Sequence, residues 1–206
     1  MRQITASGSE PEPNRDCGDF QTVYTACMTR LLLPDRTIVL IGLMGVGKTT
    51  VGRRLAATLD RPFKDADEEV ERAAGRTVSE IFDDFGEVAF RDGERKVIAR
   101  LLEAPPMVLA LGGGAFVDPA TRKLVRDGAV SVWLRADVDT LVRRVTKRDT
   151  RPLLRHGDPH SILSALLERR TPAYDEADIQ VDASQGSHQE TVSRIVAELE
   201  AREAQA

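Results

Sequence analysis

A glycine-rich segment followed by a lysine and a threonine carries the strongest chemical signal in this sequence. Residues 42–49 read Gly-Leu-Met-Gly-Val-Gly-Lys-Thr and match the pattern G-x-x-x-x-G-K-[ST]. The glycines let successive N–H groups face a phosphate, the lysine neutralises phosphate charge, and the hydroxyl can bind Mg²⁺. An apolar β-branched run, Thr37–Ile41, precedes the segment and a helical pattern follows it. The segment therefore predicts a nucleoside triphosphate site, and it leaves the acceptor of the phosphoryl group open.

Two aspartates, Asp65 and Asp67, follow the next short apolar run, which starts near Pro62. Parallel α/β sheets bind ligands at the carboxyl ends of their strands, and a carboxylate there can orient a hydroxyl group and accept its proton. If the strand stays extended past Asp65, both side chains lie on one face. The competing interpretation is that they cap the following helix, where aspartate is favoured. The two roles are compatible.

Three consecutive glycines, Gly112, Gly113 and Gly114, come directly after the apolar run Met107–Leu111. Because they lack side chains, their N–H groups can approach an oxygen-rich ligand closely. A tight turn into the helix that begins near Asp118 would explain one glycine but not three. We therefore expect the backbone to contact a ligand here.

Arginines supply the remaining candidates, because a guanidinium group matches a carboxylate or phosphate in two-point geometry. By sequence alone, Arg91 and Arg170 would be solvated residues on helix faces. Arg151 opens a polar segment, residues 149–160, which suits a mobile lid that excludes water and delivers a cation to a phosphate. An ordinary surface loop is the alternative for that segment. Three further arginines belong to no such pattern and are expected on the surface: Arg72, Arg95 and Arg169.

Six motifs in order resemble the shikimate kinase family, and the likeness covers about residues 36–184. They are Gly42–Thr50, Asp65-Ala-Asp67, Phe90-Arg91, Leu111–Ala115, Arg151–Leu154 and Arg170-Thr-Pro-x-Tyr174. The resemblance implies ATP-dependent phosphorylation of the shikimate 3-hydroxyl, giving shikimate 3-phosphate and ADP on the route to chorismate and the aromatic amino acids. Several members of the family carry another residue where this chain has Asp92.

The resemblance also implies a role for each acceptor and metal residue. Thr49 and Asp65 are expected to bind Mg²⁺, the aspartate directly or through water. Asp67 is expected to orient the acceptor hydroxyl and take its proton, and Tyr174 to brace the helix that binds the substrate. The shikimate-binding residues that the resemblance implies are Asp67, Arg91, Gly112, Gly113, Gly114 and Arg170, with the two arginines on the carboxylate.

The ATP side follows in the same way. Lys48 and Arg151 are expected to stabilise the transferring phosphate and, with Asp67, to be the catalytic residues. Arg144 resembles a family arginine that stacks on adenine, although a solvent-facing arginine explains it nearly as well. The expected ATP-binding residues are Gly45, Val46, Gly47, Lys48, Thr49, Thr50, Arg144 and Arg151.

Three alternatives compete with this interpretation. A gluconate kinase or a nucleoside monophosphate kinase would share the fold, but the Leu-Gly-Gly-Gly-Ala run and Phe90-Arg91 disfavour both by family pattern. A GTP-dependent switch would need an Asn-Lys-x-Asp element, and the sole asparagine of this chain is Asn14. A non-catalytic binding module would not need the intact set of Lys48, Thr49, Asp67 and Arg151.

The hydrophobic pattern predicts the elements that position these residues. Short apolar runs alternate with helical patterns, so we expect an α/β fold: a three-layer α/β/α sandwich with a central parallel sheet of about five strands, the P-loop kinase fold with a mobile lid. Residues 77–80 and 187–190 have the form of capping boxes. The first opens a helical stretch through about Leu102, which Gly86 and Gly93 are expected to break.

The composition of the chain limits where the protein is expected to be located and which partners it is expected to bind. A net charge of -4 without a cluster of basic residues gives no reason to expect nucleic acid as a partner. No apolar run reaches the roughly 18–20 residues that span a membrane. Residues 1–30 are polar and acidic, so we expect a disordered leader, with Met28 as an alternative start, before a kinase-like domain over 31–206. Cys17 and Cys27 are expected as free thiols, a disulfide or half of a metal site being the alternative. We expect a cytoplasmic monomer.

Overall fold

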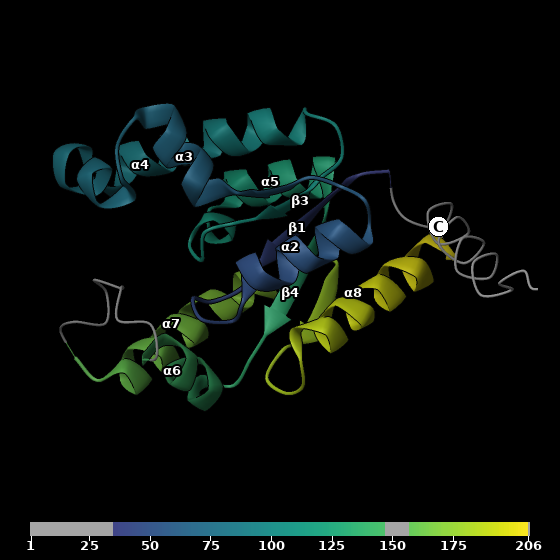
Figure 1. Ribbon diagram of the computed structural model, residues 1–206. Coiled ribbons are helices and arrows are strands. Elements are labelled where there is room, and N and C mark those ends of the chain that lie inside the picture. Colours follow the sequence, from purple (N-terminus) through teal and green to yellow (C-terminus); the bar gives the residue numbers. More distant parts are fainter. Residues whose placement is uncertain (1–34, 147–156, 206) are drawn as a thin grey trace, which may run out of the picture. The chain divides into compact units, whose positions relative to one another are not determined.

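The computed structural model describes residues 35–146 and 157–205, which belong to the unit Leu33–Ala206 (Figure 1). The strands are β1 (Thr37–Ile41), β2 (Phe63–Asp65), β3 (Val108–Ala110), β4 (Ala129–Arg135) and β5 (Ile179–Asp182). The helices are α2 (Lys48–Thr58), α3 (Ala66–Ala74), α4 (Val78–Leu102), α5 (Pro119–Gly128), α6 (Val138–Thr146), α7 (Pro159–Tyr174) and α8 (His188–Glu203), with a 3-10 turn, η1, at Ala115–Val117. The predicted leader, and the predicted lid up to residue 156 with Arg151, lie outside the described residues.

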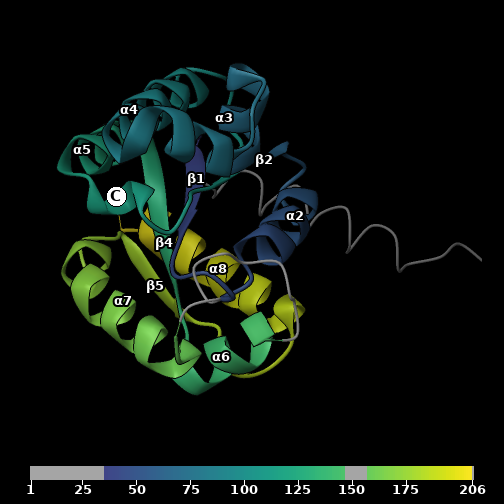
Figure 2. The ribbon, with the colours of Figure 1, turned by 90° about the vertical axis from the view of Figure 1, so that its left-hand side faces the viewer.

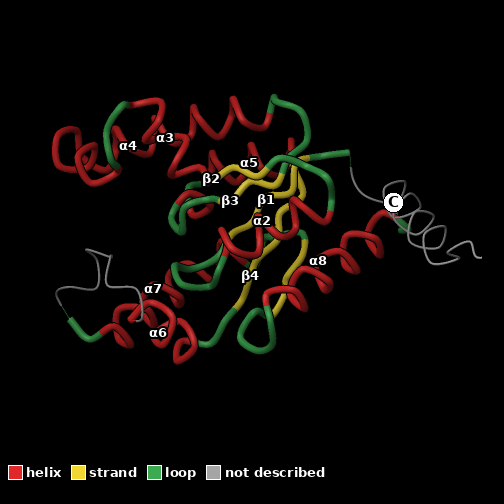
Figure 3. Tube along the Cα trace, in the orientation of Figure 1, coloured by secondary structure: helices red, strands yellow, loops and turns green. Residues whose placement is uncertain are grey.

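The five strands form one parallel sheet in the order β2-β3-β1-β4-β5 (Figure 3). Strand β1 is buried along its whole length, which agrees with its continuous apolar sequence. In the register, Leu40 pairs with Ala110, and Ala110 pairs with Asp65. Because all strands run in the same direction, the loops after β1, β2 and β3 emerge at one edge of the sheet. The glycine-rich segment 42–49, called the P-loop from here on, lies at that edge with the two aspartates and the three glycines.

Helices cover both faces of the sheet. Helices α2 and α8 pack against each other on one face, where α2 contacts β1 and β3 and α8 contacts β5. Helix α5 packs on β4 from the opposite face, with α4 beside it (Figure 2). The core is made of the strands and the inner faces of these helices, including Leu40, Leu55, Val125 and Ile195, each of which is fully buried. The predicted three-layer α/β/α sandwich is confirmed.

Helix α4 has the predicted start but only one of the two predicted breaks. Thr77 and Glu80 form the capping box, in which each side chain accepts a hydrogen bond from the other residue's backbone N–H. At Gly86 the backbone leaves the helical region, with φ 77° and ψ 172°, and the helix kinks. Gly93 stays helical, so the prediction of a break there was wrong. An interior glycine costs a helix only about 1 kcal/mol, which the packing of α4 on α3 and α5 can offset.

Two further sequence predictions can be compared with the structure. The second capping box, between Ser187 and Glu190, is confirmed at the start of α8. Among the described residues, no helix is long and apolar enough to cross a membrane.

Candidate active site

The loop between β1 and α2 requires glycine at several positions. Gly42, Gly45 and Gly47 have φ values of 138°, 83° and 102°, a region that other residues rarely adopt. A Cβ on Gly42 would lie 2.6 Å from the carbonyl oxygen of Leu134, and one on Gly45 would lie 2.6 Å from Cγ1 of Val145. Gly47 begins α2 without a side-chain cap, so the first N–H groups of this helix remain available for an anion.

Lys48 and Thr49 are the first two residues of α2, directly after this loop. The Nζ of Lys48 donates to the carbonyl oxygens of Gly42 (2.8 Å) and Leu43 (3.3 Å), which holds its charge beside the loop. The hydroxyl of Thr49 donates to Oδ2 of Asp65 at 3.1 Å. The loop after β1 and the end of β2 therefore bring a hydroxyl and a carboxylate together at the start of α2.

The two aspartates occupy different elements. Strand β2 ends at Asp65 and α3 begins at Ala66, so the condition for both carboxylates to share one strand face, an extended strand past Asp65, is not met. Asp65 is the N-cap of α3, and its Oδ1 accepts the N–H of Asp67 at 3.2 Å. The capping interpretation is thus confirmed for Asp65. Both residues still line one cavity, because Asp67 sits in the first turn of the helix.

The environment of Asp67 favours its neutral form. Burial raises the pKa of its carboxyl group above the ordinary 3.8, and the negative charge of Asp65 raises it further. The positive charges of Lys48 and Arg91 act in the opposite direction without cancelling this effect. Asp67 is therefore a stronger proton acceptor than a solvated aspartate.

The three glycines after β3 lie against charged side chains from three other elements. A Cβ on Gly112 would lie 2.6 Å from Oδ1 of Asp67. A Cβ on Gly113 would lie 2.8 Å from NH1 of Arg170, and one on Gly114 would lie 2.5 Å from NH2 of Arg91. Larger residues would displace each of these groups. Glycine at these three positions therefore lets the Asp67, Arg170 and Arg91 side chains lie against the backbone.

Arg91 is held in place by a residue that the sequence analysis missed. Its NH1 donates at 2.6 Å to Oε2 of Glu94, whose side chain is only 2 % exposed. The other oxygen, Oε1, is buried and has no hydrogen-bond partner among the described residues. Burial raises the pKa of Glu94, although Arg91 opposes the shift. The i, i+3 spacing from Arg91 in a predicted helix was the available signal.

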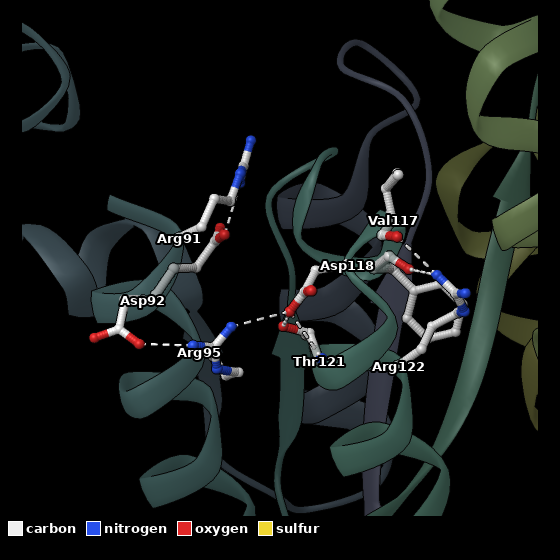
Figure 4. Close-up of polar contacts among 9 residues, drawn as sticks. Arg91, Asp92, Arg95, Val117, Asp118, Thr121 and Arg122 are labelled. Carbon is white, nitrogen blue, oxygen red and sulfur yellow. Dashed lines mark hydrogen bonds and ion pairs between the residues drawn. The ribbon is translucent and has the colours of Figure 1, made fainter. Parts of the chain in front are cut away.

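A polar network connects α4 with the start of α5 (Figure 4). Arg95 donates to Asp92 at 2.6 Å and to Asp118 at 3.5 Å. Asp118 in turn caps α5 by accepting the N–H of Thr121 at 3.0 Å. Arg95, expected only as a surface residue, is partly buried and links two helices, and Asp92 supplies one of its partners. Arg72, which was also expected on the surface, is exposed and pairs with the buried Glu69.

Helix α7 brings Arg170 and Tyr174 to the same side of the glycine segment. Tyr174 is fully buried and its hydroxyl donates to the carbonyl oxygen of Gly113 at 2.5 Å. Its ring packs on Trp133 with a centroid distance of 5.5 Å. Tyr174 thus joins the helix that carries Arg170 to the glycine backbone.

Arg144 and His188 border the far end of the P-loop. Arg144 donates to the carbonyl oxygens of Val46 (3.2 Å) and Ala183 (2.9 Å), so it is an ordered residue rather than a solvated one. His188, the first residue of α8, lies close to the loop: a Cβ on Gly47 would be 3.3 Å from its Nε2. The sequence analysis missed His188, and nothing in its spacing marked it.

One cavity of about 590 Å³ unites these groups. All the predicted site residues line it except Val46, a buried residue of the loop itself, and Arg151, which lies outside the described residues. Glu94 and His188 line the cavity as well, with an apolar wall made of Val78, Phe82, Phe90 and Leu111. The cavity joins the glycine-rich loop to a second compartment that holds two arginines, the buried carboxylate of Glu94 and the half-buried carboxylate of Asp67.

Comparison with known proteins gives a consistent family. The shikimate kinase family model matches residues 44–200. A shikimate kinase of Caulobacter vibrioides is 59 % identical over 167 residues, which cover 81 % of this chain and 84 % of the relative. A shikimate kinase of Paramagnetospirillum magneticum is 56 % identical over 161 residues, covering 78 % and 83 %.

Solved structures lead to the same family. Shikimate kinase from Acinetobacter baumannii in complex with shikimate superposes with a TM-score of 0.78 at 35 % identity, covering 84 % of this chain and 98 % of that one. A gluconokinase from Sinorhizobium meliloti, with a TM-score of 0.55 and 22 % identity, shares the fold. The predicted shikimate kinase resemblance is confirmed. This chain belongs to the shikimate kinase family, whose members are ATP-dependent kinases of a small-molecule alcohol.

Proposed function

We propose a residue-level mechanism for the family reaction, in which ATP phosphorylates the 3-hydroxyl of shikimate to give shikimate 3-phosphate and ADP. The observation that carries the proposal is the convergence of Asp67, Arg91 and Arg170 on the three glycines, inside the cavity that the P-loop also lines. This arrangement supports a clamp for the acceptor carboxylate and a proton acceptor in the cavity that also holds the proposed phosphate site.

The nucleotide phosphates bind the N–H groups of the P-loop and the start of α2. Lys48 neutralises charge on the β- and γ-phosphates. Arg144 and His188 border the cavity beyond Gly47, where the adenosine would extend. Arg144 is therefore assigned to the base, as the sequence resemblance implies.

Thr49 and Asp65 are the residues that would hold Mg²⁺. Their oxygens lie 3.1 Å apart at the start of α2, and Mg²⁺ prefers hard oxygen ligands, usually one or two protein groups with phosphates and waters completing the shell. No larger cluster of His, Cys, Asp or Glu is suited to a metal in the described part of the chain, which agrees with a metal that arrives with the nucleotide. When bound, the ion supplies positive charge to the β- and γ-phosphate oxygens.

The acceptor binds in the second compartment. Arg91 and Arg170 hold its carboxylate, because guanidinium groups pair with carboxylates in two-point geometry. Asp67 orients the 3-hydroxyl and accepts its proton as the oxygen attacks the γ-phosphorus. One O–P bond forms as the bond between that phosphorus and the leaving oxygen of ADP breaks, so the transfer is a single in-line displacement.

Arg151 completes the proposal. We assign to it the second cation on the transferring phosphate and to the segment 149–160 the role of a lid, on the sequence pattern and the resemblance. A lid matters because water that reached the γ-phosphate would compete with the acceptor. The cytoplasmic location, the monomeric state and the absence of nucleic-acid and membrane partners stay predictions.

A panel of acceptors tests the proposed function. Purified protein with MgATP is supplied in turn with shikimate, gluconate and a nucleoside monophosphate, and ADP release is measured. We expect turnover with shikimate alone, with loss of turnover in Asp67→Asn as the control against a contaminating kinase. Turnover with gluconate or the monophosphate and none with shikimate would refute the proposal.

A further inference from the structure

We propose that Phe82 is a specificity-determining residue of the acceptor compartment: together with Phe90, it rejects acceptors that carry a hydroxyl group on the carbon that bears the carboxylate. The inference rests on the proposed function and goes beyond it, because it states which feature of the acceptor ring the enzyme rejects and which side chain rejects it.

The kink in α4 builds the aromatic pair. Phe82 and Phe90 are eight residues apart, and a straight helix rises about 1.5 Å per residue, so it would separate them by roughly 12 Å along its axis. Their ring centroids instead lie 4.5 Å apart, with the rings tilted by 36°. Between them the backbone of Gly86 leaves the helical region, and a Cβ on Gly86 would meet nothing within 4 Å. The bend of the backbone, rather than close packing at Gly86, therefore brings the two rings together.

The pair forms the cavity wall beside the proposed carboxylate clamp. Phe90 directly precedes Arg91, whose guanidinium carbon lies 5.1 Å from the centroid of the Phe90 ring. Both rings line the cavity, Phe90 being buried and Phe82 half-buried. In two-point pairing a carboxylate lies one hydrogen-bond length from the guanidinium group. A carboxylate on Arg91 therefore brings the carbon that bears it next to this aromatic wall.

The polar side chains of the compartment lie against the glycine segment 112–114 instead. They are Asp67, Glu94, Arg91 and Arg170. The aromatic wall adds Val78 from the same helix, so its side chains offer neither a hydrogen-bond donor nor an acceptor. A hydroxyl group that faces this wall loses its hydrogen bonds to water and gains none from these side chains.

The chemistry of the acceptor explains why this wall is selective. In shikimate the carbon that bears the carboxylate belongs to the ring double bond, so it is flat and has no hydroxyl group. Quinate has the same carboxylate and the same three hydroxyl groups at the other positions, but this carbon is tetrahedral and bears a hydroxyl group of its own. An apolar pocket rejects a ligand with one added hydroxyl group by about 10²-fold. We expect discrimination of that size between the two acceptors.

Wild-type kinetics with three acceptors test the inference first. Dihydroshikimate has a tetrahedral carbon at this position without the hydroxyl group, so it separates the effect of shape from that of polarity. We expect kcat/KM for dihydroshikimate to be within about tenfold of that for shikimate, and kcat/KM for quinate to be lower than that for shikimate by about 10²-fold or more. Either of two results overturns the inference: quinate within about tenfold of shikimate, or dihydroshikimate as poor as quinate.

Replacement of Phe82 by asparagine supplies the missing polar partner. The amide can donate to or accept from the added hydroxyl group, so the preference for shikimate over quinate should fall to about tenfold or less. Phe82→Leu also removes the ring but keeps the wall apolar, and its preference should stay within about threefold of that of wild type. An unchanged preference in active Phe82→Asn, or the same loss of preference in Phe82→Leu, contradicts the role of Phe82.

The matched control is Phe85→Asn. Phe85 lies on the same helix, is 60 % exposed and is not among the residues that line the cavity. The same exchange at this position should leave the preference for shikimate unchanged. An equal loss in the control overturns the inference while the proposed function stands, whereas absence of wild-type turnover with shikimate overturns both. If Phe82→Asn does not fold, the three acceptors with wild type still decide.

Discussion

Replacement of Glu94 by glutamine should stabilise the folded protein at neutral and alkaline pH. The Glu94 side chain is 2 % exposed, and among the described residues only one of its two oxygens has a partner, the guanidinium of Arg91 at 2.6 Å. Leaving a buried polar atom unpaired costs about 1–3 kcal/mol, and more when it carries charge. The amide oxygen can still accept from Arg91, and its NH2 group takes the unpaired place of Oε1 without carrying charge, so the part of the cost that is due to the charge is removed.

The pH dependence follows from the direction of the pKa shift. Burial raises the pKa of Glu94 in the folded state above its ordinary 4.5. A raised pKa contributes stability that is fully present below the unfolded value and is lost as pH rises through the folded value. Glutamine resembles the protonated carboxyl group at every pH. The variant and the wild type should therefore be similar near pH 4, and the variant should become the more stable by about 1 kcal/mol or more at pH 8.

Urea unfolding at several pH values measures this difference. The chain has a single tryptophan, Trp133, which is buried on β4 and whose fluorescence reports unfolding. Glu87→Gln is the matched control, because Glu87 lies on the same helix and 3.5 Å from Arg91 but has 68 % of its side chain exposed. We expect that control to change stability by less than about 0.5 kcal/mol at every pH. The reasoning fails if Glu94→Gln is less stable than wild type at pH 8, or if its advantage does not depend on pH.

Three further substitutions separate the parts of the site. Asp67→Asn should lower kcat by roughly 10²- to 10⁴-fold, the usual contribution of a general base, and leave the Kd for ATP nearly unchanged; an equal loss of ATP affinity, measured by calorimetry, would contradict its role. Because the pKa of Asp67 is raised, wild-type kcat/KM for shikimate should fall as the pH drops through the pKa of this carboxyl group. Arg91→Ala should raise the KM for shikimate by about tenfold or more, and an unchanged value would remove it from the clamp. Arg144→Ala should raise the KM for ATP several-fold without affecting shikimate, because it frees the carbonyl groups of Val46 and Ala183; the same assay with both substrates decides.

The proposed nucleotide half of the site is determined by local sequence. The P-loop combines glycines with positive φ, a preceding buried strand and a following helix within about 20 consecutive residues, so its backbone turn is encoded locally. Distant residues such as Arg144 pack against it and donate to it. The capping boxes at Thr77 and Ser187 are local for the same reason. Each is a contact between residues three apart, and such contacts are encoded by spacing alone.

The proposed acceptor half of the site depends on the tertiary structure. Asp67, Arg91, Gly114 and Arg170 come from four parts of the chain and meet because β1, β2 and β3 end at one edge of the sheet and α4 and α7 pack beside it. No local pattern predicts that a guanidinium group on α4 or α7 will lie against a glycine in the loop after β3. The family resemblance supplied those residues, and the geometry shows how close they lie.

The remaining features could be read only from the packed structure. Glu94 has ordinary sequence surroundings, and the sequence marked Tyr174 only as a brace for the substrate-binding helix. The burial of both side chains comes from packing: among the described residues one carboxylate oxygen of Glu94 has no partner, and the Tyr174 hydroxyl is held on a glycine carbonyl. Gly93 shows the reverse, because packing kept helical a residue whose local propensity predicted a break. Sequence determines which chemistry is available over short spacings, whereas burial and convergence depend on residues far apart in the chain, so only the tertiary structure decides them.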